Sequence, residues 1–253
     1  MHKILKKFIH VIKILSIVSI MILIIVGSLA WSRLKGSYED PNFIFSGNSI
    51  VNDSEYQVFL AKITASNLLD DNFANLAEKI EQHPYVSGVR VSKHFPNNVL
   101  VEISERYPVA LINSSPILLV DNKSTVLPFR SNSFDLQIPI ISNFDIDNKS
   151  MPMGNKTESK HIEQAVHFLN RLKLEYPELY DNLSEFRLNE YDEYELILED
   201  EPTKIVIGET MAWSKILILQ EFEKNIKGHK SLTDYVYLNL RYNNQVITRE
   251  RQV

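Results

Sequence analysis

The side chains that could bind a metal ion or transfer a proton lie in two short segments of the second half of the chain. His161, Glu163 and His167 fall in one expected helix, and Asp145 and Asp147 fall in a polar segment before it. Glu163 and His167 are four positions apart and could share a metal ion, whereas His161 and His167 lie on different helix faces. The pair Asp145-x-Asp147 lacks the third oxygen ligand and the glycine of a calcium loop. We therefore interpret both segments as solvated surface.

The composition offers little else for catalysis. The 253 residues include no cysteine, which excludes thiol catalysis, a disulfide scaffold and a Cys-ligated metal site. They include only seven glycines, which leaves little material for phosphate-binding loops. The chain contains no G-x-S-x-G, Walker A, G-x-G-x-x-G or H-E-x-x-H motif. The 27 Lys and Arg against 32 Asp and Glu give a net charge of −5, which indicates no broad nucleic-acid surface. We expect no enzyme, no cofactor, and no catalytic or metal site.

An uncharged apolar segment lies near the N-terminus. Residues 14–31 read ILSIVSIMILIIVGSLAW, and as a helix they span about 27 Å, close to the thickness of the hydrocarbon core of a bilayer. Four lysines precede this segment and two basic residues follow it closely, so the N-terminus should stay in the cytoplasm and the bulk of the chain outside. We expect a cytoplasmic tip over residues 1–13 and one transmembrane helix over residues 14–31. A cleaved signal peptide is the alternative, but the basic lead and the apolar run are both long for one.

After a polar linker over residues 32–42, the patterns predict a small domain over residues 43–105. Its expected elements are a strand at 43–45, a helix opened by the capping box of Ser54 and Gln57, a second helix from Asp71 or Asn72 to Pro84, and strands at 89–92 and 99–104. The last two strands form a hairpin, and both helices must cover one face of the sheet. This β-α-α-β-β order is typical of a polypeptide-transport-associated (POTRA) domain.

Residues 106–253 predict a β-rich domain with covering helices. The expected strands are 109–112, 117–120, 125–127, 138–141, 183–189, 194–199, 204–207, 235–242 and 246–249, and the expected helices are 161–176 and 211–225. The fold class is therefore α+β: a single N-terminal transmembrane helix, a POTRA domain and a β domain.

Several segments resemble one known family. The segments are 83–86, 89–91, 95–103, Glu105-Arg106-Tyr107-Pro108-Val109-Ala110, 118–121, Ile207-Gly208 with Lys215, and Leu238-Asn239-Leu240-Arg241-Tyr242. They resemble the hairpin of a POTRA domain, the E-R-x-P-V-A junction and the near-terminal D-L-R-Y of the FtsQ/DivIB bacterial cell-division proteins. Asn239 stands where that family usually has Asp.

The resemblance implies a non-enzymatic scaffold of the divisome in the inner (plasma) membrane at the division septum. It implies FtsB/DivIC-like and FtsL-like coiled-coil partners, and through them the septal peptidoglycan synthase. In the family, the partner adds a strand to the last strand of the β domain. Arg241 and Tyr242 match the positions that face this partner. Val246, Ile247 and Thr248 are then expected in the terminal strand, where β-branched residues suit pairing.

Three other functions fit parts of the sequence. One is a type II membrane-anchored lumenal transferase that uses Asp145 and Asp147 with a divalent metal ion. The second is a POTRA protein of another transport system, which would usually carry several POTRA units and a transmembrane barrel. The third is a peptidoglycan-binding or signalling ectodomain without division partners. The POTRA-like order of elements argues against the transferase, and the short acidic tail argues against the barrel.

Overall fold

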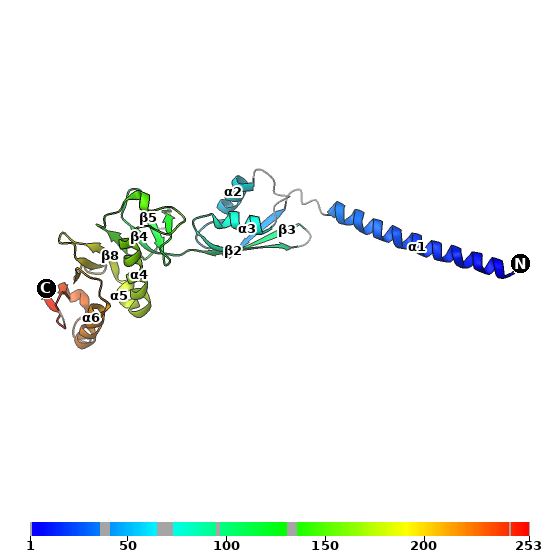
Figure 1. The fold of residues 1–253 in the computed structure, drawn as a ribbon. Helices are drawn as coiled ribbons and strands as arrows, with labels where there is room; N and C mark the ends of the chain where they lie inside the picture. The colour runs from blue at the N-terminus through cyan, green and yellow to red at the C-terminus, as the bar shows by residue number, and fades with distance from the viewer. Residues whose placement is uncertain are drawn as a thin grey trace.

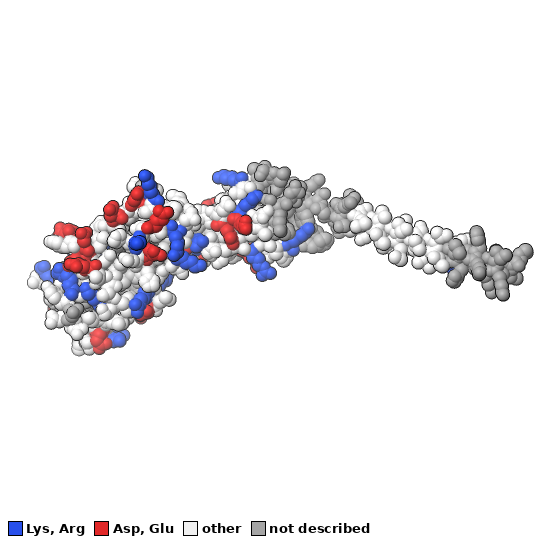
Figure 2. Space-filling view, in the orientation of Figure 1, with Lys and Arg blue, Asp and Glu red and all other residues white. Residues whose placement is uncertain are grey.

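The apolar N-terminal segment forms one long helix, α1 (His2–Lys35). The computed structural model describes residues 2–35, 41–64, 73–94, 97–130, 136–242 and 244–252. Within α1, Ile12–Trp31 has a mean hydropathy of 2.6 and none of it is buried, so this helix is long and apolar enough to cross a membrane. Figure 1 shows α1 apart from the folded domains, and Figure 2 shows its described surface as almost uncharged.

The POTRA domain has the predicted order of elements. It consists of β1 (Asn42–Ser46), α2 (Asp53–Thr64), α3 (Phe73–Glu81), β2 (Val86–His94) and β3 (Asn98–Glu105). The strands lie in the order β1-β3-β2, with β1 parallel and β2 antiparallel to β3. Alternate residues of β3 are buried among the side chains of α2 and α3, which makes one core for the domain.

The start of α2 differs from the prediction. Helix α2 begins at Asp53, and the carbonyl oxygen of Asn52 accepts hydrogen bonds from the backbone N–H of Glu55 and of Tyr56. Ser54 therefore lies inside the helix and is not its N-cap. The reason is nonlocal: the carboxylate of Glu105 accepts hydrogen bonds from three backbone N–H groups of residues 49–51 and fixes where the preceding loop ends. The predicted start of the second helix at Asp71 or Asn72 lies outside the described residues.

The β domain is built on a nine-stranded sheet with helices on one face (Figure 1). Its strands are β4 (Pro108–Ile112), β5 (Leu118–Asp121), β6 (Val126–Pro128), β7 (Ile140–Ser142), β8 (Leu183–Leu188), β9 (Tyr194–Leu198), β10 (Lys204–Gly208), β11 (Tyr235–Asn239) and β12 (Ile247–Glu250). Its helices are α4 (Lys160–Glu175), α5 (Pro177–Asp181) and α6 (Trp213–Ile226), with short 3-10 turns η2 (Asn148–Ser150) and η3 (Leu232–Asp234). The predicted α+β fold class is confirmed.

The order of the strands is β12-β11-β10-β9-β8-β7-β4-β5-β6. The pairs β4–β7, β7–β8 and β10–β11 are parallel, and the other pairs are antiparallel. The helix predicted over residues 161–176 is α4, which ends at Glu175. A separate short helix that was not predicted, α5, begins at Pro177, because proline has no N–H to continue a helix but suits the first position of the next.

Two rows of side chains cross this sheet on opposite faces. The row under the helices contains Ile112, Ile141, Phe186, Leu196, Ile205 and Leu238, all fully buried, and ends at Thr248. The row on the other face contains Leu127, Leu119, Leu111, Ile140, Glu185, Ile197, Lys204, Tyr237 and Arg249. The change from leucine to charged residues along the second row indicates that only its first part is covered.

The POTRA domain covers that first part. Leu119 and Leu127 are fully buried in the core of the POTRA domain, so one hydrophobic cluster belongs to both domains. The hydroxyl of Tyr85 donates a hydrogen bond to the carbonyl oxygen of Pro128 at 2.7 Å. Arg130 donates two hydrogen bonds to the carboxylate of Glu55, at 2.7 and 2.6 Å. The two domains therefore meet through a packed interface, and the sheet face beyond β7 stays open.

Candidate partner-binding edge

Strand β12 forms one edge of the nine-stranded sheet. It pairs with β11 on one side, with Ile247 opposite Asn239, Thr248 opposite Leu238 and Arg249 opposite Tyr237. In the described part of the chain, no strand pairs with its outer side. At the other edge, Val126 of β6 makes a backbone bridge to Met153, and Thr125 just before the strand makes one to Lys156. Strand β12 is therefore the edge with unpaired N–H and C=O groups available to another strand.

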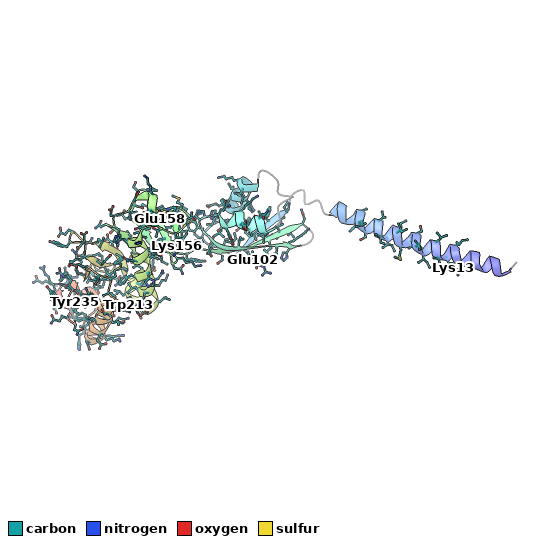
Figure 3. All side chains as sticks on the ribbon, viewed as in Figure 1. Lys13, Glu102, Lys156, Glu158, Trp213 and Tyr235 are labelled. Carbon is teal, nitrogen blue, oxygen red and sulfur yellow. The ribbon has the colours of Figure 1, made fainter. Side chains whose placement is uncertain are left out.

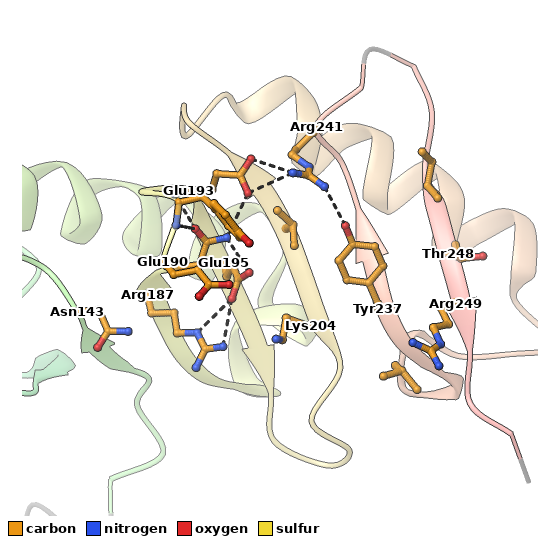
Figure 4. Close-up of a pocket in the computed structure, with 15 residues that line it drawn as sticks. Asn143, Arg187, Glu190, Glu193, Glu195, Lys204, Tyr237, Arg241, Thr248 and Arg249 are labelled. Carbon is orange, nitrogen blue, oxygen red and sulfur yellow. Dashed lines mark hydrogen bonds and ion pairs between the residues drawn. The ribbon is translucent and has the colours of Figure 1, made fainter.

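The predicted site residues take different positions around this edge. Ile247, 46% exposed, and Thr248 lie in β12, whereas Val246 precedes the strand and packs against the core of the β domain. Tyr242, 54% exposed, lies in the bend after β11. Arg241, Ile247 and Thr248 line the same hollow, of about 840 Å³, on the open face of the sheet (Figure 4). Tyr242 and Val246 do not line it.

Arg241 is held by neighbouring strands. Its guanidinium forms an ion pair with Glu193 at 3.1 Å and donates a hydrogen bond to the hydroxyl of Tyr237 at 3.3 Å (Figure 4). The side-chain oxygen of Asn239 accepts hydrogen bonds from the backbone N–H and from Nε of Arg241, at 2.9 and 3.1 Å. The hydrogen bond to Glu193 raises the pKa of Arg241 above its ordinary value. Arg241 therefore ties the segment after β11 to the turn that precedes β9.

These contacts explain how Asn239 takes the place of an aspartate. Asn239 is buried, and its neutral amide oxygen accepts both hydrogen bonds from Arg241. The negative charge comes instead from Glu193, whose side chain is only 12% exposed. Sequence reasoning missed Glu193 because it lies in a turn 48 positions before Arg241. The available signal was the acid at every second position in Glu193-Tyr194-Glu195, which suits the polar face of a strand.

A second arginine, Arg251, holds the C-terminal end of β12. Arg251 donates hydrogen bonds to the carbonyl oxygens of Thr233 and Tyr235, both at 3.3 Å, and pairs with Glu201 at 3.6 Å. Glu250 forms an ion pair with Lys230, and this hydrogen bond raises the pKa of Lys230. The C-terminal end of this four-residue edge strand is therefore anchored by side chains, although only one side of the strand is bonded.

The join between β10 and α6 supports the same region. Gly208 has a φ of +102°, and a Cβ there would lie 3.1 Å from Cγ of Arg241 and 3.2 Å from Nζ of Lys215. Lys215 donates a hydrogen bond to the carbonyl oxygen of Ile207 at 2.6 Å. Glycine at this position therefore lets Arg241 and Lys215 approach the end of β10. Figure 3 places Trp213, at the start of α6, and Tyr235 in this same part of the domain.

The acidic and histidine side chains singled out in the sequence, such as Asp147 and Glu163, do not form a metal site with other described residues. Among the described residues, no group of three or more His, Asp or Glu side chains could hold a metal ion. Asp147 accepts a hydrogen bond from the backbone N–H of Lys149 at 3.0 Å, and Glu163 pairs with Lys156 at 3.4 Å.

Comparison with known proteins relates both domains to one family. Residues 42–106 match the family model for the POTRA domain, FtsQ-type. Residues 107–249, more than half of the chain, match the model described as FtsQ/DivIB, C-terminal related.

Curated relatives bear the name Cell division protein FtsQ. The relative from Syntrophotalea carbinolica is 23% identical over 175 residues, which cover 69% of this chain and 61% of that protein. The relative from Geotalea daltonii is 24% identical over 178 residues, covering 70% of this chain and 62% of that protein. The match thus spans about three fifths of the length of these relatives. Together with the family models, these similarities establish that the chain belongs to the FtsQ/DivIB family of bacterial cell-division proteins.

Proposed function

We propose that this protein is a non-enzymatic, membrane-anchored scaffold of the bacterial divisome that captures a partner by β-strand addition at β12. The observation that carries the proposal is the open outer side of β12 within the described residues. Main-chain hydrogen bonds to an added strand supply affinity, and neighbouring side chains supply specificity. The anchoring of the C-terminal end of β12 by Arg251 supports this reading, because a preformed edge loses less conformational entropy when a partner binds.

The proposed partners are an FtsB/DivIC-like and an FtsL-like coiled-coil division protein, which link the scaffold indirectly to the septal peptidoglycan synthesis machinery. The proposed location is the inner (plasma) membrane at the division septum. Residues 1–13 are then a cytoplasmic tip, residues 14–31 the transmembrane helix and residues 32–42 a linker. The POTRA domain over residues 43–105 and the β domain over residues 106–253 lie outside the cytoplasm. The excess of lysines before the apolar segment supports this orientation.

The test compares partner capture by full-length chains in detergent-solubilised bacterial membranes. In Ile247→Pro, the substitution removes one backbone N–H of β12 and restricts its φ. We expect this variant to lose the FtsB/DivIC-like and FtsL-like proteins that the unaltered chain retains. A chain that ends at Leu240 lacks β12 and should lose them too.

Ile247→Val is the matched control, because it keeps the N–H and the β-branched shape and should retain capture. Circular dichroism and the midpoint of thermal unfolding should be nearly unchanged in Ile247→Pro, since Ile247 lies at an exposed edge. Equal recovery of the partners by Ile247→Pro, by the truncated chain and by the unaltered chain would exclude β12 as the interface.

A further inference from the structure

Three side chains form a row that leads to the outer side of β12. Lys204 of β10 is opposite Tyr237 of β11, and Tyr237 is opposite Arg249 of β12. All three line the hollow on the open face, and Figure 4 shows them on adjacent strands. Lys204 and Arg249 are exposed, whereas Tyr237 is half-buried between them. The open face thus presents two cations on either side of an aromatic ring, and Arg249 lies nearest to the edge.

Some charged side chains in this hollow are paired with one another within the β domain, and others are not. Glu193 pairs with Arg241, and Glu195 pairs with Arg187 at 3.2 Å and accepts a hydrogen bond from Asn189. These two glutamates are buried, so their charges are taken up within the β domain. Lys204 and Arg249, by contrast, have no ion pair with any of the described residues. The remaining carboxylate of the hollow, Glu190, lies in the β8–β9 turn and not in the row.

A strand added beyond β12 would extend the rows of the sheet. Residues directly opposite each other on neighbouring strands have Cβ atoms about 5 Å apart, close enough for charged side chains to interact. The added residue opposite Arg249 would therefore lie on the open face beside that guanidinium. The added residue opposite Ile247 would lie two positions away on the same face, because side chains alternate along a strand. The residue between them would turn towards the helix-covered face beside Thr248.

We propose that Arg249, supported by Lys204, selects a partner strand with a carboxylate opposite Arg249 and an apolar side chain two positions away, opposite Ile247. This inference rests on the proposed function and specifies the chemistry of its partner. Arg249 supplies the unpaired charge, and the exposed side chain of Ile247 supplies the apolar contact. Arg241 has a different task, because its guanidinium is already bound to Glu193, Asn239 and Tyr237. A cross-strand pair of opposite charges favours one register and one partner sequence over others.

The experiment measures the affinity of the full-length chain, in lipid nanodiscs, for the FtsB/DivIC-like protein of the same cell. Arg249→Glu should bind at least about ten-fold more weakly, because the carboxylates would repel across the strand pair. The control Lys123→Glu makes the same change of charge in the β5–β6 turn of the same domain and should bind like the unaltered chain. Raising the salt concentration from about 0.05 M to about 0.5 M should weaken partner binding by the unaltered chain and by this control. It should not weaken binding by Arg249→Glu, because salt screens repulsion as well as attraction.

A charge exchange identifies the partner residue. Each acidic residue in the partner's strand is replaced in turn by lysine, and one replacement should restore binding to Arg249→Glu while weakening binding to the unaltered chain. Unchanged affinity of Arg249→Glu, together with loss of binding by Ile247→Pro, would overturn this inference and leave the proposed function intact. Absence of binding by the unaltered chain would overturn both. Similar thermal unfolding of Arg249→Glu and the unaltered chain checks that the fold is retained.

Discussion

At the residue scale, the guanidinium of Arg241 binds three different side chains. Glu193 supplies a charge, Asn239 a neutral oxygen and Tyr237 a hydroxyl. The expectation that Arg241 faces a partner remains a proposal. Its contacts, however, give it a role within the β domain. Replacement of Arg241 by an acid would place a second carboxylate beside that of Glu193, whose side chain is only 12% exposed, so capture and stability should change together.

The variant Arg241→Glu should lower the free energy of unfolding by roughly 2 kcal/mol, because it removes a charge-assisted hydrogen bond and leaves Glu193 without its cation. Urea unfolding of the full-length chain in nanodiscs measures the change. Arg249→Glu is the matched control, since Arg249 has no ion pair with the described residues and should cost less than about 0.5 kcal/mol. Equal stability of the two variants would contradict the internal role of Arg241.

His83 makes the stability of the POTRA domain depend on pH. It is 7% exposed, lies 5.0 Å from the ring of Tyr56 and 4.9 Å from that of Phe59, and accepts a hydrogen bond from the N–H of Tyr85. Burial lowers the pKa of His83 below 6.5, and Arg130 lowers it further, although Glu55 at 3.9 Å acts in the opposite direction. Burial is the largest of these effects, so the pKa of His83 is lower in the folded state than in the unfolded chain.

As pH falls below about 6.5, the unfolded state binds a proton that the folded state excludes, so stability should fall by up to about 1.4 kcal/mol per pH unit. Unfolding free energies measured from about pH 7 to about pH 5 test this slope. In His83→Asn, whose side-chain oxygen can still accept from Tyr85, the slope should largely disappear. The lowered pKa of Glu55 acts at lower pH, below 4.5. The same slope in both proteins would exclude His83 as its source.

At the scale of elements, local sequence patterns predict individual strands and helices better than they predict how the strands pair. Alternating apolar residues predicted the hairpin strands of the POTRA domain, because period-two burial follows directly from the pleat. Several strands of the β domain are instead short apolar segments that are buried almost throughout. The order of the strands depends on contacts between distant segments. Strand β10 lies parallel to β11 across α6, and β1 pairs with β3 across two helices. The edge residues Ile247 and Thr248 could be identified by resemblance, whereas Glu193 and Arg251 became evident only from the folded neighbourhood.

Arg251 should determine how firmly β12 stays paired with β11. Arg251→Ala removes two hydrogen bonds to backbone carbonyl oxygens and the pair with Glu201. We expect the β12 amides that bond to β11 to exchange about ten-fold faster with deuterated solvent, corresponding to about 1.4 kcal/mol of local stability. Arg249→Ala, two positions earlier, is the control and should leave these rates nearly unchanged. Identical exchange in all three proteins would show that β11 alone holds the strand.

The whole molecule is organised around the shared face of the large sheet. The POTRA domain covers this face at β4–β6, through Leu119 and Leu127, and leaves it open from β8 to β12. The sequence could not predict that the POTRA domain covers this face. Domain boundaries and helical periodicity describe each domain separately, whereas these contacts join the two domains. Glu55 and Arg130, 75 positions apart, close the junction on one side. The two domains should therefore resist relative rotation.

Arg130→Met should lower the free energy of unfolding by roughly 2 kcal/mol, because it removes the double hydrogen bond to Glu55 from a partly buried interface. Urea unfolding followed separately in each domain measures the effect, and the two transitions should move together. Arg90→Met is the control, since Arg90 is 82% exposed, pairs with Glu102 at 3.7 Å and should contribute less than about 0.5 kcal/mol. An equal cost for both variants would contradict a junction held by Arg130.

Amide hydrogen exchange, with and without the FtsB/DivIC-like partner, tests strand addition most directly. The full-length chain in nanodiscs is compared in both states, and residues 247–250 are followed one by one. Addition of a strand predicts that the outward N–H groups of β12, unpaired by the described residues, exchange much more slowly in the complex, while β6 at the opposite edge is unchanged. Slower exchange elsewhere, with β12 exchanging as fast as in the free protein, would contradict the account.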